Sequence, residues 1–257
     1  MRSDNSDAGT AIRPRPCFFL PLIFCTALLV PSFLSASDPK DALISFLEQM
    51  ELSYAKVNDY QAIFHKQERL EGKLLPEETI LLKFQKPLKI YMHWIGELLK
   101  GQEALYVQGQ YDDKLIAHRG GILGLVTMSL DPDGPTAMQG NRYPITKAGF
   151  GNTIEQLRYN VDRALRHGDL QIIRIGEEPF EGRPAAVIEA GFTSREGREY
   201  HAARMVIHLD GEFMLPVGSR YFDQKDILIE KYTYTDVKLN AGFTDMDFSR
   251  SNEEYHF

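Results

Sequence analysis

Hydrophobic positions along the chain follow a helical spacing over residues 38–56. The apolar residues of this stretch recur at the i, i+3, i+4 spacing of one helix face and are Ala42, Leu43, Phe46, Leu47 and Met50. Asp38 is suited to cap the start of the helix, and Pro39 is suited to its first turn. The pattern predicts an amphipathic helix over residues 38–56.

After this stretch, apolar and polar residues alternate with a period of two, which is typical of half-buried antiparallel strands. The alternation predicts strands over residues 60–65, 80–85, 88–94, 104–108, 114–119, 170–175, 184–192, 200–210, 214–223 and 227–239. A second helix, capped by Asn152 or Thr153, is indicated by Ile154, Leu157 and Val161 on one face. These elements predict an α+β protein with one strongly curved antiparallel sheet of about ten to eleven strands and with helices on a single face.

Residues 120–151 interrupt this alternation with a high density of glycine and proline. Such density predicts an irregular insertion, and loops of this length are usually functional. We expect the insertion to cover one opening of the curved sheet as a lid. Asn141 and Arg142 are the expected anchors of this lid through polar contacts.

Residues 1–37 have the layout of a secretory signal peptide. Arg2, Arg13 and Arg15 precede an apolar stretch over residues 17–30, and the small residues 35–37 follow it. Cleavage is expected after Ala36 or Ser37, between Ala36 and Asp38, which leaves one domain over residues 38–257 and a periplasmic or otherwise exported protein. A retained membrane anchor is the alternative, although Pro21 and Pro31 bound a rather short apolar stretch.

Composition and motifs exclude several classes of function. The formal net charge is −7 and no run of Lys and Arg occurs, which argues against a nucleic-acid partner. The only cysteines, Cys17 and Cys25, lie in the predicted signal peptide, so the exported chain has no disulfide, no cysteine-ligated zinc and no cysteine nucleophile. The histidines form no metal-binding motif, and no GxSxG occurs. We therefore expect no metal, no cofactor and no catalytic residues.

Two short charged motifs have plain structural interpretations. Asp131 and Asp133 belong to an Asp-Pro-Asp-Gly sequence, which predicts a tight turn in preference to a calcium site. The sequence Lys66-Gln67-Glu68-Arg69 places alternating charges on one strand, which predicts a solvated face or a sheet edge.

Large apolar side chains share one face of consecutive predicted strands: Phe64, Ile80, Leu82, Phe84, Ile90, Met92, Trp94 and Tyr106. This face has two interpretations. It is either a core filled by the two helices or the lining of a cavity for a lipid or acyl chain. The alternation does not decide between them.

The order of motifs in the C-terminal half resembles that of the LolA-like periplasmic proteins. The matching segments are residues 205–210, Leu215-Pro216, residues 220–223 and residues 230–240. A closer resemblance is to a bacterial family catalogued as a domain of unknown function, number fifteen seventy-one. Its motifs are matched by residues 66–69, 91–94, 129–135 and 141–146, although Tyr143 stands where the family pattern suggests a histidine.

The LolA-like resemblance implies an unclosed half-barrel that is covered on its concave face by helices and contains a hydrophobic cavity. Carriers of this group, LolA and LolB among them, bind the acyl chains of lipoproteins. The resemblance thus favours a non-enzymatic envelope protein that binds a lipid or an acylated protein, with the eight apolar residues as its cavity lining. A structural or regulatory protein that binds an envelope partner through its sheet edge is one alternative, and a hydrolase using acidic residues of the insertion is another.

Overall fold

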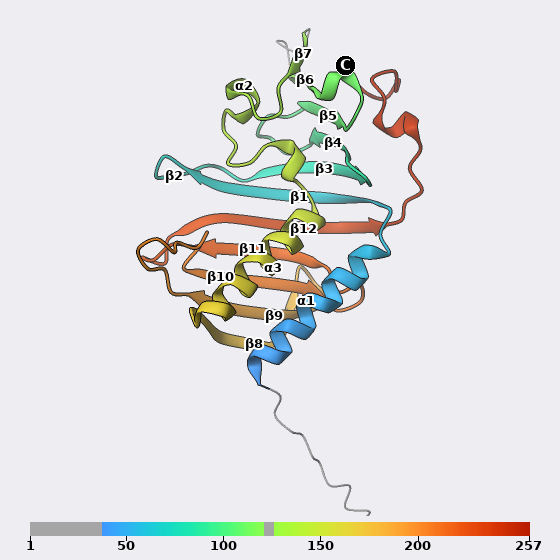
Figure 1. Ribbon diagram of the computed structural model, residues 1–257. Helices are drawn as coiled ribbons and strands as arrows, with labels where there is room; N and C mark the ends of the chain where they lie inside the picture. The colour runs from blue at the N-terminus through green and yellow to red at the C-terminus, as the bar shows by residue number, and fades with distance from the viewer. Residues whose placement is uncertain (1–37, 121–125) are drawn as a thin grey trace, which may run out of the picture. The chain divides into compact units, whose positions relative to one another are not determined.

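A computed structural model describes residues 38–120 and 126–257 of the chain (Figure 1). The predicted signal peptide, residues 1–37, lies outside the described residues, as does a short part of the insertion. Within the two described ranges, no helix is long and apolar enough to cross a membrane.

Three α-helices and three short 3-10 helices occur in these ranges. They are α1 (Pro39–Ala55), α2 (Pro135–Met138), α3 (Phe150–His167), η1 (Tyr111–Asp113), η2 (Ile145–Lys147) and η3 (Asp245–Phe248). The strands are β1 (Asp59–Leu70), β2 (Lys73–Leu74), β3 (Glu78–Gln85), β4 (Lys89–Trp94), β5 (Glu103–Val107), β6 (Leu115–His118), β7 (Thr127–Leu130), β8 (Leu170–Phe180), β9 (Arg183–Phe192), β10 (Arg204–Asp210), β11 (Pro216–Phe222) and β12 (Leu228–Leu239).

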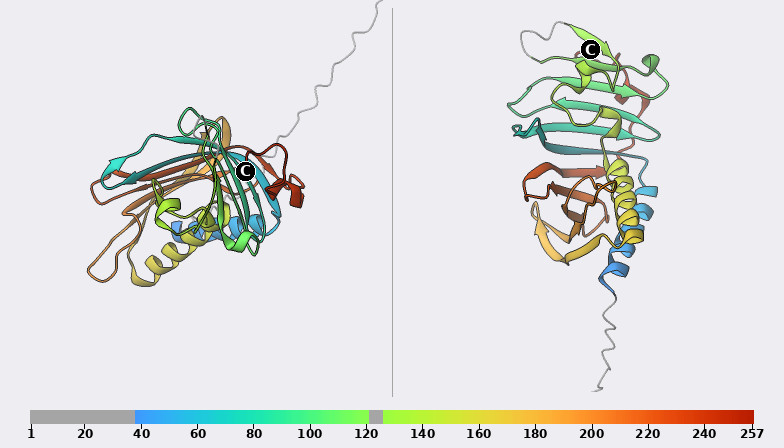
Figure 2. Two further views of the ribbon diagram at one scale, coloured as in Figure 1. Left: turned by 90° about the horizontal axis from the view of Figure 1, so that it is seen from above. Right: turned by 60° about the vertical axis from the view of Figure 1, so that its left-hand side comes forward.

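All of these strands form one antiparallel sheet in the order β7-β6-β5-β4-β3-β1-β12-β11-β10-β9-β8, with β2 paired to β1. The edge strands β7 and β8 do not pair with each other, so the sheet stays open. The sheet curves around the two long helices (Figure 2). The predicted α+β architecture with an unclosed, curved antiparallel sheet is therefore confirmed.

The sheet has twelve strands where the sequence predicts ten to eleven. Two strands are too short for a pattern of period two to reveal them. The first is β2, and the second is β7, which lies inside the glycine-rich insertion and pairs with β6 through Ile116 and Ser129. The region 200–203, predicted as strand, precedes β10 and has no ladder partners in the described sheet.

Helix α1 has the predicted position, and the Asp38 side chain accepts a hydrogen bond from the Lys40 backbone N–H at 2.9 Å. Helix α3 begins at Phe150, two residues before the predicted caps Asn152 and Thr153. The reason is a tertiary contact. The hydroxyl of Tyr60 accepts a hydrogen bond from the Phe150 backbone N–H at 3.2 Å and replaces a side-chain cap.

Helices α1 and α3 lie on the concave face of the sheet and cross the strands β8 to β12 (Figure 1). Their apolar stripes share one buried core with the strands; α1 contributes Leu43, Leu47 and Met50, and α3 contributes Ile154, Leu157 and Val161. The strands β3 to β7 are covered differently, by residues 131–149, which we call the covering segment. This difference in cover positions the functional site.

A cavity on the concave face

Side chains of the concave face form rows that run across neighbouring strands. One row consists of Tyr60, Phe84, Ile90 and Tyr106, which are directly paired from β1 to β5. Phe84 stacks on Tyr60 with ring centroids 5.0 Å apart, and Phe150 of α3 packs on Tyr60 at 4.7 Å. All these residues are buried, so this end of the face is a filled core.

The next row along the strands ends in two small side chains on β5 and β6. It consists of Ala62, Leu82, Met92, Ala104 and Ala117, paired in that order from β1 to β6. Leu82 is fully buried in the core, whereas Met92, Ala104 and Ala117 face an open space. The two alanines on β5 and β6 leave room that their neighbours do not fill.

That space is a cavity of about 950 Å³ between the sheet, the covering segment and α3. A volume near 1,000 Å³ lies at the upper end of the range for small-molecule sites. The apolar side of its lining comes mainly from the sheet and includes Phe64, Ile80, Met92, Trp94, Leu115 and Leu130. Leu98 and Leu99, in the loop after β4, line it as well and are 38% and 46% exposed, so the lining reaches solvent there.

The structure divides the eight apolar residues proposed from the sequence. Phe64, Ile80, Met92 and Trp94 line the cavity. Leu82, Phe84 and Ile90 belong to the filled core and are outside the cavity lining. Tyr106 is also buried outside the lining. Ligand binding by the first four residues stays a prediction.

The covering segment crosses the cavity and is tied to the sheet at Asn141 and Arg142. The Asn141 side-chain oxygen accepts a hydrogen bond from Lys66 Nζ at 2.5 Å. The Arg142 backbone N–H donates to a Glu68 carboxylate oxygen at 2.9 Å, and the Arg142 guanidinium donates to the Arg69 carbonyl oxygen at 2.9 Å. Both predicted anchor residues thus make polar contacts with β1, and movement of the segment as a lid stays a prediction.

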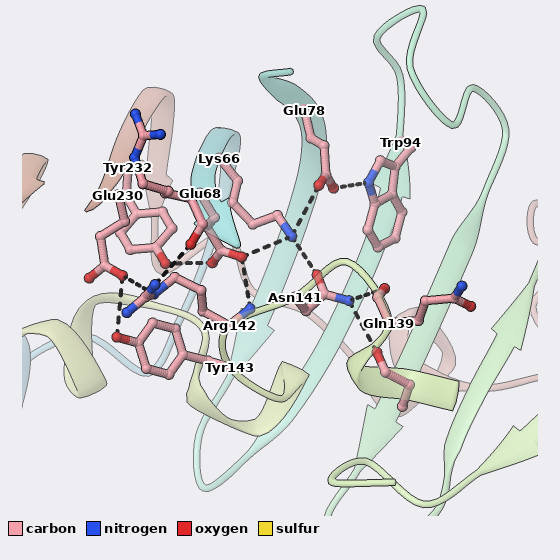
Figure 3. Close-up of polar contacts among 12 residues, drawn as sticks. Lys66, Glu68, Glu78, Trp94, Gln139, Asn141, Arg142, Tyr143, Glu230 and Tyr232 are labelled. Atoms are coloured by element: carbon pink, nitrogen blue, oxygen red, sulfur yellow. Dashed lines mark hydrogen bonds and ion pairs between the residues drawn. The ribbon is translucent and has the colours of Figure 1, made fainter. Parts of the chain in front are cut away.

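One end of the cavity is polar, and four charged residues of its lining come from the sheet (Figure 3). Lys66, Glu68, Glu78 and Glu230 all lie in its lining and are at most 8% exposed. Buried charges are tolerated only when they are paired and hydrogen-bonded, and these are. We call this group, with Asn141, Arg142, Tyr143 and Tyr232, the polar cluster.

Lys66 is the centre of one half of the polar cluster. Its ammonium lies 3.1 Å from Glu78 and 3.8 Å from Glu68, besides its hydrogen bond to Asn141. Glu78 also accepts a hydrogen bond from the Trp94 indole N–H at 2.6 Å. Trp94 therefore has its ring in the apolar lining and its N–H on a buried carboxylate, at the boundary between the two parts of the cavity.

Glu230 is the centre of the other half. Its carboxylate lies 3.0 Å from Arg142 Nε and 2.8 Å from His201 Nε2, and it accepts a hydrogen bond from the Tyr143 hydroxyl at 3.2 Å. Burial, followed by the charge of Glu230, raises the pKa of Tyr143 above its ordinary value. The Tyr143 hydroxyl therefore keeps its proton and acts as a donor.

Tyr232 joins the two halves. Its hydroxyl donates to Glu68 at 2.5 Å. Burial and the charges of Glu230 and Glu68 raise the pKa of Tyr232 strongly, so this hydroxyl also stays protonated.

The sequence-based interpretation of residues 66–69 as a solvated face is wrong for Lys66 and Glu68. On β1 the buried face continues from Tyr60, Ala62 and Phe64 to Lys66 and Glu68, at the same period of two. The alternation itself was the signal, because charged residues in phase with a buried apolar row share its face. Glu78 and Glu230 carry the same signal, since Glu78 is in phase with the buried Ile80 on β3 and Glu230 with the buried Tyr234 on β12.

The Asp-Pro-Asp-Gly turn lies outside the cavity lining. Asp131 and Asp133 form the predicted turn, in which the Asp131 side chain accepts a hydrogen bond from the Asp133 backbone N–H at 3.1 Å, and both are exposed. His93 and His118 are paired with Glu103 on the neighbouring strands β4 to β6, and of these two histidines only His118 borders the cavity. Among the residues that the structure describes, no group of three or more His, Cys, Asp or Glu is arranged to hold a metal ion.

A family model described as "Protein of unknown function (DUF1571)" matches residues 57–257 of the chain. A comparison with curated proteins gives no match. Similar solved structures include a DUF1329 family protein from Desulfovibrio piger, with 15% identity, a TM-score of 0.40, and coverage of 84% of this chain and 99% of that chain. The Mycobacterium tuberculosis lipoprotein LppX has 12% identity, a TM-score of 0.47, and coverage of 79% and 98%. A LolA superfamily protein from Nitrosomonas europaea has 11% identity, a TM-score of 0.33, and coverage of 80% and 97%.

Proposed function

The chain belongs to the DUF1571 family, as its motifs suggest, and from that premise we propose a function based on the cavity. The protein is a non-enzymatic binding protein of the cell envelope, and it holds the acyl chain of a lipid or of an acylated protein. The single observation that carries this proposal is the cavity of about 950 Å³ with an apolar lining on the concave face.

The size of the apolar lining sets the affinity that such a ligand can reach. An acyl chain of about twelve methylenes gains up to roughly 10 kcal/mol on burial, at about 0.8 kcal/mol for each methylene. The loss of rigid-body freedom and the ordering of the chain offset several kcal/mol of this gain. A dissociation constant on the order of micromolar follows.

The polar cluster supports binding over catalysis. Each of its carboxylates is already engaged by a basic group of the protein, since Lys66 lies beside Glu68 and Glu78, and Arg142 and His201 lie beside Glu230. The acidic residues of the insertion that a hydrolase would use, Asp131 and Asp133, are exposed turn residues outside the cavity lining.

Export is part of the proposal, because a carrier of acyl chains in the envelope has to leave the cytoplasm. The basic, apolar and small residues of positions 1–37 are its support. Mass spectrometry of the protein from cells should find Ser37 or Asp38 at the N-terminus. An intact Met1 in membrane fractions would show that the segment is retained.

Trp94 provides the test of the cavity itself, because it is the only tryptophan in the chain and lies in the lining. Titration with 1-myristoylglycerol should shift its emission to the blue and saturate in the micromolar range, since an acyl chain replaces water beside the ring. The matched variant Ala117→Phe narrows the cavity beside Ala104 and should reduce the shift. An absent shift in the wild-type protein, or an equal shift in the variant, would contradict the proposal.

A further inference from the structure

The cavity is apolar along the sheet but acidic at one end, and this asymmetry bears on the head group of its ligand. We propose that the polar cluster selects an amphiphile whose head is neutral or positively charged and donates hydrogen bonds, and that it discriminates against an anionic head. This inference rests on the proposed function, because it concerns the ligand of the same cavity.

The first support is the balance of charge. Three carboxylates, those of Glu68, Glu78 and Glu230, have side chains that are 4%, 9% and 4% exposed. Among the residues that the structure describes, two permanent cations, Lys66 and Arg142, form ion pairs with them. In the same part of the chain, His201 is the further basic group that contacts them, and it carries a charge only when protonated. A further negative charge at this end meets an excess of carboxylate in a site where water screens little.

The second support is the use of hydrogen-bond donors. Lys66 donates one hydrogen bond, to Asn141, and its ammonium forms ion pairs with Glu78 at 3.1 Å and Glu68 at 3.8 Å. The Asn141 amide donates both of its hydrogens to backbone carbonyl oxygens, those of Ala137 and Gln139.

Three further donors of the cluster are engaged by carboxylates. The Tyr232 hydroxyl donates to Glu68, the Tyr143 hydroxyl to Glu230 and the Trp94 indole to Glu78. An anionic head that takes one of these three donors would have to break its bond to a carboxylate. The Arg142 Nε–H makes no hydrogen bond, but it lies 3.0 Å from the Glu230 carboxylate, whose charge already balances that of the guanidinium.

The carboxylate oxygens of the cluster, in contrast, can accept further hydrogen bonds. An ionised carboxylate offers about four lone-pair sites. Glu78 has two partners, Trp94 and Lys66, so part of its acceptor capacity is free at the boundary between the apolar lining and the polar cluster. A hydroxyl or ammonium group at the end of an acyl chain held beside Trp94 finds an acceptor at this place.

Three further basic residues line the cavity outside the polar cluster. Lys100, Arg119 and Lys147 line the cavity but are exposed, and Lys100 is paired with Glu97 at 3.2 Å. Solvent screens these charges, so they contribute little to the retention of an anion. The buried, poorly screened charges are those of the polar cluster.

The test compares two lipids that differ by one phosphate. 1-Myristoylglycerol and 1-myristoyl lysophosphatidic acid share the acyl chain and the glycerol, so their difference in affinity reports on the head group alone. Calorimetric titration of the wild-type protein, below the micelle concentration of either lipid, should show that the neutral lipid binds at least about tenfold more tightly.

A matched pair of variants locates the effect. Glu78→Gln removes one buried carboxylate charge and should narrow the gap between the lipids by strengthening the binding of the phosphate-bearing one. Glu77→Gln is the control, because Glu77 is the neighbouring residue, lies outside the cavity lining and pairs with Lys231 at 2.9 Å. It removes the same charge and should leave the difference in affinity between the two lipids unchanged. Glu230→Gln replaces Glu78→Gln if the latter does not fold.

Each outcome has a defined meaning. Equal affinities, or tighter binding of the lysophosphatidic acid, would overturn the head-group inference and leave the acyl-binding function in place. An equal narrowing in Glu77→Gln and Glu78→Gln would show that overall charge, and not the polar cluster, sets the preference. Binding of neither lipid would contradict the proposed function itself and this inference with it.

Discussion

The concave face of the sheet is filled at one end and hollow at the other, although the same strands build both ends. Phe84 and Ile90 lie in a core closed by Tyr60 and Phe150. Ile80 lies four residues from Phe84 on β3, and Trp94 lies four residues from Ile90 on β4. Both line a cavity of about 950 Å³. The apolar character of the strands is the same in both places.

The difference lies in what covers the face. At the filled end, Phe150 at the start of α3 packs on Tyr60, which stacks on Phe84, and the apolar stripes of α1 and α3 belong to the same core. Over the hollow end lies the covering segment, which lines the cavity with the small Ala137 and Gly140 as well as with Ile145, and which is tied to β1 by polar contacts. The comparison teaches that alternation identifies the buried face of a sheet, whereas the opposing element decides whether that face is a core or a cavity.

The largest expected effect is on the free energy of unfolding, when leucine is replaced by alanine in the filled core and in the cavity lining. Leu82→Ala, in the filled core, should lower the free energy of unfolding by about 2–5 kcal/mol, because it leaves a void among close-packed neighbours. Leu130→Ala, in the cavity lining, should cost less than about 1.5 kcal/mol, because one side of this leucine already faces open space. Chemical denaturation measures both values, and equal losses would mean that the hollow end is packed as well.

The reverse substitution probes the same row with added volume. Ala62→Phe inserts a ring into the core and should destabilise the protein by about 1–3 kcal/mol or more. Ala117→Phe, on the same cross-strand row, places its ring in the cavity and should leave the melting temperature nearly unchanged. A severe loss of stability in Ala117→Phe would show that the cavity has no room for the ring.

Ligand binding should slow amide exchange more in the covering segment than in helix α3. On binding of 1-myristoylglycerol, amide exchange in the covering segment should slow by roughly tenfold, because the ligand stabilises the closed arrangement. The core of α3, around Val161, is already packed and should change much less. Uniformly slow exchange in the covering segment, unaltered by ligand, would identify it as a fixed structural element and not a lid.

The smallest effect concerns an exposed ion pair between the two helices of the filled end. Arg158 donates two hydrogen bonds to Glu51, at 2.7 and 2.8 Å, and the pKa of Glu51 is lowered below its ordinary value of 4.5 by this contact. Its stabilising contribution is therefore present above pH 4.5 and is lost as the pH falls through the lowered pKa.

Exposed pairs of this kind contribute about 0.2–1 kcal/mol. The unfolding free energies of the wild-type protein and Glu51→Gln should thus differ by this amount at neutral pH and converge as the pH falls through the lowered pKa of Glu51. A difference that persists unchanged at low pH would contradict an ionic origin. Acyl-lipid affinity should be the same in both proteins, because Glu51 is remote from the cavity lining.

The sequence was sufficient to predict most of the helices and strands, and the face that they bury. The period of two located β1, β3 and β4, the helical period located α1, and the same alternation selected Phe64, Ile80, Met92 and Trp94. These features are local, since they depend on where each side chain points along its own strand or helix.

What the sequence could not supply depends on contacts across long separations. Leu82 and Met92 are direct neighbours on one face, yet only Met92 lines the cavity, because the cover above them differs. Glu230 reaches the polar cluster from β12 and contacts Arg142, and this pairing has no trace in the local pattern. Leu82→Glu would unfold the protein whether or not a cavity exists, because it places an unpaired charge in the filled core.

The central claim is that the hollow end of the face holds an acyl chain, and native mass spectrometry tests it most directly. The protein is purified from the cell envelope under conditions that keep bound lipids, and its mass is compared with that of the Ala117→Phe variant prepared in parallel. The account predicts that the wild-type protein carries an additional lipid mass and that the folded variant, whose cavity is narrowed, carries less of it. A folded wild-type protein without any bound lipid, or a variant that carries as much lipid as the wild type, would contradict it.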